Sequence, residues 1–118
     1  METALRRAIL AVVVLVFAVE AQQQHHRASG WADLNSSVQR MHSSMASVKP
    51  SGNEDVDFVR LMLPHHQAAI EMAKTQLLLG KDPQLNRLAQ EIITDQQSEI
   101  DLMQLWLKQH ESTPPATK

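Results

Sequence analysis

Two stretches of the chain carry their nonpolar residues at alternating steps of four and three, which is the repeat of one helix face. The first begins at Phe58 and ends at Leu79, and the second begins at Leu85 and ends at His110. Only residues 80–84, Gly-Lys-Asp-Pro-Gln, separate the two stripes. Because so short a connection can only reverse the chain, the pattern predicts an antiparallel helical hairpin.

A third, shorter helix is predicted ahead of this hairpin. Apolar residues from Leu34 to Val48 follow the same alternation, and Asp33 is placed to cap the helix. The breaker sequence Lys49-Pro50-Ser51-Gly52 ends it. No segment alternates as a strand does. The predicted fold is therefore all-α: a helical bundle built on a long antiparallel helical hairpin plus a shorter N-terminal helix.

The ends of the hairpin helices carry capping signals of their own. Asn53 or Asp55 is placed to cap the first helix, and Gly80 lies just past its end. Asp82 is placed to cap the second helix, with Pro83 at the first helical position, where a missing N–H costs nothing.

The N-terminus is typical of a signal peptide. Arg6 and Arg7 precede an apolar run over residues 8–19, and Val19-Glu20-Ala21 offers small residues for cleavage after Ala21. A retained membrane anchor is the alternative, but twelve apolar residues fall short of the roughly 20 that span a bilayer. Residues 1–21 are therefore predicted to direct export, through either the general or the twin-arginine route, to a bacterial periplasm or the medium.

The rest of the chain divides by composition. Residues 22–32 are polar and aperiodic and are predicted to form a disordered lead-in, residues 33–111 the helical bundle domain, and residues 112–118 a disordered tail. The net charge of −2 predicts neither a nucleic-acid partner nor a membrane partner once the signal is cleaved. Cysteine is absent, while six histidines and six methionines are the first indication of metal binding.

Polar residues interrupt the apolar stripes of the two long helices. With Lys81 as the midpoint of the hairpin, His65 lies opposite Gln97. Gln96 and Glu99 are then on either side of His65, on the facing helix. The same register puts Met62 opposite Ile100, between Glu99 and Met103, with His66 flanking the layer. Buried polar groups must satisfy one another or bind something, because burial without a partner costs several kcal/mol.

The first connection extends this group. A reversal near Ser51 and Gly52 puts Met41 level with Met62, with His42 and Met45 close by. Thioether sulfur suits Cu(I), and imidazole suits several ions including copper, so histidine with methionine and no cysteine favours copper, as Cu(I), Cu(II) or both. Pro64, just before the paired histidines, is expected to kink its helix.

The residues resemble a known family. The string Met62-Leu63-Pro64-His65-His66-Gln67, followed by Gly80-Lys81-Asp82-Pro83, is similar to the family named domain of unknown function 305, over roughly residues 35–108. The resemblance implies a ferritin-like bundle, usually exported, with members implicated in periplasmic copper binding and resistance. The resemblance places the family signature at Met62, His65, His66, Met72, Gln96, Glu99 and Met103, and its N-terminal part at Met41, His42 and Met45.

Three hypotheses follow. The preferred one is a periplasmic or secreted copper-binding protein, not an enzyme, in which Gln96 and Glu99 orient an imidazole or bind the ion and Met72 serves mainly for packing. The second is a ferritin-like di-iron enzyme. Such an enzyme needs Glu-x-x-His pairs, and this sequence has none. The third is a helical module without metal, in which one histidine of the pair bonds Glu99 inside the core and the other faces solvent. A homodimer is expected because so small a domain buries little surface.

Overall fold

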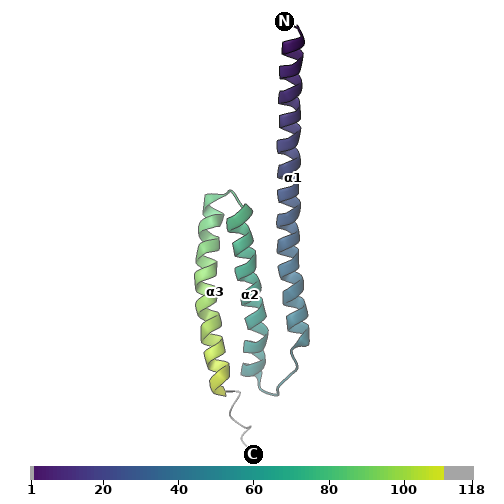
Figure 1. Cartoon of the computed structure of the whole chain (residues 1–118). Coiled ribbons are helices and arrows are strands. Elements are labelled where there is room, and N and C mark those ends of the chain that lie inside the picture. The colour runs from purple at the N-terminus through teal and green to yellow at the C-terminus, as the bar shows by residue number, and fades with distance from the viewer. Residues whose placement is uncertain (1, 111–118) are drawn as a thin grey trace, which may run out of the picture. The chain divides into compact units, whose positions relative to one another are not determined.

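The computed structural model describes residues 2–110 and consists of three helices (Figure 1). They are α1 at Glu2–Ser47, α2 at Glu54–Leu79 and α3 at Pro83–His110. No strand occurs in this part of the chain, which confirms the all-α prediction. The predicted tail at residues 112–118, and residue 111 of the predicted bundle domain, lie outside the described residues.

The chain divides into two compact units, Met1–Ala32 and Asp33–Lys118. In the first unit the apolar side chains from Ile9 to Val19 are exposed. None of the helices in the described range is both long enough and apolar enough to cross a membrane.

Residues 22–32 are helical in the structure, in contrast to the predicted disordered lead-in, and α1 therefore does not begin at an Asp33 cap. The Asp33 carbonyl instead accepts a hydrogen bond from the Ser37 hydroxyl. The physical reason is that residues 22–32 contain several good helix formers and no proline, so one glycine does not interrupt the backbone ladder.

The predicted caps of the hairpin helices are present. The side-chain oxygen of Asn53 accepts hydrogen bonds from the backbone N–H groups of Asp55 and Val56 at 3.0 and 3.3 Å. The carboxylate of Asp82 does the same for α3. Gly80 lies just past the end of α2, as predicted; its backbone is extended, and its N–H donates to the Gln76 carbonyl.

The helices α2 and α3 run antiparallel (Figure 1). Their register is given by His66 bonded to Glu99 and by Gln76 bonded to Asn86. The bond between Gln76 and Asn86 is centred on Lys81, the predicted midpoint of the hairpin, and the bond between His66 and Glu99 is centred between Asp82 and Pro83. Met62 lies one turn before His66, and Met103 lies one turn after Glu99.

The core is small, and the face of α2 that it buries is not the predicted one. Because α2 packs against α3 on one side and against the end of α1 on the other, its buried positions are not the predicted stripe. Phe58, which begins that stripe, is 61% exposed, and His65 is exposed while His66 is buried. The buried apolar residues are Val56, Val59, Ala68, Ile70, Ala73, Ala89 and Ile100.

Candidate functional site

A buried imidazole joined to a carboxylate lies at the middle of the hairpin. His66 of α2 is 8% exposed. Its Nδ1 lies 2.9 Å from the Met62 carbonyl oxygen, one turn earlier in the same helix. Its Nε2 lies 2.6 Å from Oε2 of Glu99 on α3, whose side chain is about half exposed to solvent. Both ring nitrogens therefore have a partner, and the ring orientation is fixed from both sides.

These partners determine where the protons are. A backbone carbonyl only accepts hydrogen bonds, so Nδ1 of His66 carries a hydrogen that it donates to Met62. With Nδ1 protonated, a hydrogen bond between Nε2 and Glu99 needs one further proton lying between those two atoms. The pair is thus an imidazole and a carboxylate that share a single proton.

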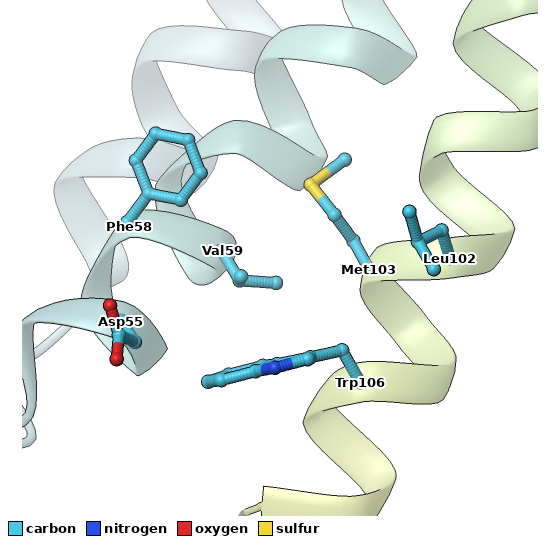
Figure 2. Close-up of a pocket in the computed structure, with 6 residues that line it drawn as sticks. All are labelled: Asp55, Phe58, Val59, Leu102, Met103 and Trp106. Atoms are coloured by element: carbon cyan, nitrogen blue, oxygen red, sulfur yellow. The ribbon is translucent and has the colours of Figure 1, made fainter.

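Two sulfur atoms belong to the adjacent layer. Met62 and Met103 are half-buried, and they lie one turn from His66 and Glu99 respectively. Figure 2 shows the Met103 side chain extending from α3 toward α2, above the Trp106 ring. The groove at this end of the hairpin is lined by Asp55, Phe58, Val59, Leu102, Met103 and Trp106.

The remaining predicted α2 and α3 residues surround this pair without joining it. His65 is exposed, with its ring centre 6.0 Å from that of His66. Gln96 is half-buried one turn before Glu99, and Met72 is half-buried nearly two turns beyond His66. Of the two predicted histidines, His66 is the one that the structure brings to the carboxylate.

The predicted N-terminal part of the site is elsewhere. Met41 lines a small cavity with Pro64, Ala68 and Glu71, on the side of α2 that packs against α1. His66, in contrast, faces α3. The prediction that Met41, and with it His42 and Met45, joins the Met62 layer is therefore not met: His42 is exposed and Met45 half-buried in α1. The longer connection between α1 and α2 explains the error, since it fixes register less tightly than residues 80–83.

An ion pair that sequence reasoning missed attaches α1 to α2. Arg40 donates to the Glu71 carboxylate at 2.6 Å and to the hydroxyl of the buried Ser37 at 3.2 Å. The hydrogen bond from Arg40, helped by one from Ser37, lowers the pKa of Glu71 below its ordinary value. No sequence motif predicts this contact. The path of the loop between α1 and α2 cannot be derived from the sequence, so neither can the residues of the two helices that meet.

Glu71→Gln is expected to reduce stability at neutral pH by less than about 1 kcal/mol, since Arg40 is largely exposed. Because the folded pKa of Glu71 is lowered, its contribution is present above the unfolded pKa and is lost as pH falls through the folded value. Urea unfolding at a series of pH values from neutral to acid checks this. The gap between wild type and variant should close below about pH 4, and a gap that widened there would contradict it.

The donor chemistry limits which metal these residues fit. No group of three or more histidine, cysteine, aspartate or glutamate side chains converges as a metal site in the part of the chain that the structure describes. The paired His66 and Glu99 supply one nitrogen and one carboxylate. The thioether sulfurs nearest to this pair along the two helices belong to the half-buried Met62 and Met103.

Comparison with known proteins gives two findings. Residues 15–107 match the family described as Domain of unknown function (DUF305). The chain is also similar to the uncharacterized protein L153 of Acanthamoeba polyphaga mimivirus, with 42% identity over 50 residues, which make up 42% of this chain and 33% of that protein. The match thus spans about a third of that relative. Since the family match covers most of the sequence, including both helices of the hairpin and the residues of the site, the chain belongs to the DUF305 family.

Proposed function

We propose that this protein is an exported copper-binding protein that holds the ion between α2 and α3. The observation that carries the proposal is the shared-proton pair of His66 and Glu99, with the imidazole anchored through Nδ1 to the Met62 carbonyl. A metal-binding histidine almost always donates its other ring N–H to a carbonyl or a carboxylate, which fixes the ring for the metal. His66 already has that anchor.

The donor atoms support copper over other ions. When its proton is removed, Nε2 of His66 becomes a metal donor, and the Glu99 oxygen beside it is a second. Sulfur from Met62 and Met103 would complete the set. Thioether ligands select Cu(I), whereas magnesium, calcium and manganese prefer oxygen. The absence of cysteine suits an oxidising compartment, where free thiols are readily converted to disulfides.

Export is supported by the first unit of the chain. Arg6 and Arg7 precede a helical run whose apolar side chains are exposed from Ile9 to Val19. Such a run is the central part of a secretory signal. The intact mass of the protein, isolated from bacteria through a C-terminal tag, identifies its first residue. A mass lacking residues 1–21 supports export to the periplasm or medium.

The test of copper binding is a Cu(I) titration of this isolated protein against a competing chelator. We expect one variant, Met62→Leu with Met103→Leu, to weaken binding by more than the roughly 10–100-fold seen when an orienting partner is lost. Leucine and methionine have similar volumes, so the fold should be retained. His66→Ala is expected to abolish binding, and Glu99→Gln to weaken it.

The matched control makes the same chemical change in α1. Met41→Leu with Met45→Leu removes two half-buried thioethers, of which Met41 lines the cavity between α1 and α2, and we expect Cu(I) affinity to stay at the wild-type value. Equal losses in the two double variants would contradict the proposed site. Absence of Cu(I) binding by the wild-type protein would reject copper altogether.

A second function is favoured by one observation. Both ring nitrogens of His66 have protein partners, so the polar layer is satisfied without a metal and can act to fix the register of the two helices. A helical module that binds a protein partner is therefore the reading that remains if the Cu(I) titration fails.

A further inference from the structure

One side of the hairpin, which we call the open face, carries exposed apolar side chains of both helices among half-buried ones. Phe58 of α2 is 61% exposed and Leu102 of α3 is 66% exposed. Both line the groove of Figure 2, which shows that their stripes lie on the same side of the hairpin. Following the repeat of each helix, the open face comprises Phe58, Met62, His65, Ala69, Met72, Gln76 and Leu79 of α2 and Leu85, Leu88, Ile92, Asp95, Glu99, Leu102 and Trp106 of α3.

The opposite side of the hairpin is more polar, and α1 packs there. On α2 the helical repeat places Arg60, Gln67 and Lys74 on that side, and Gln67 lines a cavity with Ser37 and Met41 of α1. On α3 it places Gln90, Gln97, Asp101 and Gln104 there. The exposed apolar side chains of the open face, Phe58, Leu88 and Leu102, mark it as a surface that another molecule covers.

The small core and the size of the open face both indicate how much surface a partner would bury. Of the seven buried apolar residues in the described range, three are alanines. A helix of 26 residues is about 39 Å long, and two helices side by side are about 20 Å wide. The open face is thus on the order of 800 Å², which is what each partner of a stable complex contributes.

We propose that a second copy of this chain covers the open face, related by a two-fold axis parallel to the helices. This symmetry packs α2 of each copy against α3 of the other, at the same level along the hairpin and in the opposite direction. The result is a four-helix bundle of two hairpins with heptad packing in its interior.

The levels along the face are complementary under this symmetry. His65, exposed on α2, comes level with Glu99 of the other copy, whose carboxylate is about half exposed. Asp55, at the start of α2, comes level with His110 of the other copy, at the end of α3. The apolar residues Phe58 and Met62 come level with Trp106 and Leu102 of the other copy, whereas Gln76 and Asp95 are further polar positions of the face.

The other possible two-fold axis, perpendicular to the helices, fits less well. It packs α2 against α2 and α3 against α3. Because His66 and Glu99 lie near the middle of their helices, this arrangement brings the two Glu99 carboxylates together. Like charges placed face to face across an interface oppose association. Charge complementarity therefore favours the axis parallel to the helices, which joins the two polar layers into one.

Light scattering of the isolated protein tests the dimer, and this inference does not rest on copper binding. We expect the mass of two chains for wild type and of one chain for Phe58→Glu with Leu102→Glu. Leu78→Glu is the matched control: Leu78 is 78% exposed on α2 but lies outside the open face, so this variant should remain a dimer. A wild-type monomer, or a control that dissociates equally, would overturn the proposal.

Cross-linking tests the symmetry, since the chain has no cysteine and single thiols can be introduced cleanly. A mixture of His65→Cys and Leu102→Cys proteins, treated with a short bismaleimide, should give a cross-linked heterodimer. His65→Cys alone should give little product. Efficient cross-linking of His65→Cys to itself would show the perpendicular axis and overturn the proposed one. Circular dichroism of each variant verifies that it is folded.

Discussion

Ile70→Ala is expected to destabilise the protein more than any other single truncation of an apolar side chain. Ile70 is 2% exposed, and it is the largest side chain that is fully buried in the described residues. Truncating a buried isoleucine to alanine costs about 2–5 kcal/mol, because apolar contact is lost and a cavity remains. In a domain with so few buried apolar residues, this is a large part of the total free energy of unfolding.

Urea unfolding followed by circular dichroism, at one fixed protein concentration, measures the effect. Leu78→Ala is the control, because the same kind of truncation at an exposed α2 position should change stability by no more than about 0.5 kcal/mol. Similar unfolding midpoints for the two variants would show that the core is not where the structure places it.

The second large effect is expected from Glu99→Ala, which should lower the free energy of unfolding by about 1–3 kcal/mol. This change leaves Nε2 of the buried His66 without its partner while the bond from Nδ1 to Met62 remains. Glu99→Gln should recover most of the loss, because the amide can donate to Nε2 once the shared proton is gone.

Nitrogen NMR of the imidazole ring separates this account from a simple packing effect. In wild type Nδ1 should carry a hydrogen and Nε2 should share one, whereas in Glu99→Gln only Nδ1 should be protonated. Equal stability of the alanine and glutamine variants would show that the carboxylate does not support His66 in the folded protein.

The sequence predicted the elements of the fold but not which faces they bury. The helical hairpin, its short reversal before Pro83 and the cap at Asp82 were predicted correctly, and of the two caps left open for α2 the structure has Asn53. Caps and breakers act within a few residues, which is why the sequence predicts them. The predicted buried face of α2 was wrong. A strong apolar stripe was assigned to the core, yet the buried positions are those that meet α1 and α3, and only tertiary packing determines them.

The same limit applies to the candidate site. The sequence predicted that Glu99 shares a layer with the paired histidines, and it left open a reading in which one histidine bonds Glu99 and the other faces solvent. The structure matches that geometry, with His66 inside and His65 outside. Which of two adjacent residues faces inward depends on about 100° of helix rotation, and that rotation is set by the contact of α2 with both neighbours.

The single proton between Nε2 of His66 and Glu99 has a consequence for which oxidation state of copper the proposed site would hold. Uptake of an ion requires that proton to leave. Exchange of one proton for a monovalent cation leaves the charge of the His66 and Glu99 pair unchanged. A divalent ion would add one positive charge where desolvation makes extra charge costly. Charge balance and sulfur chemistry would thus select the same, reduced form of the metal.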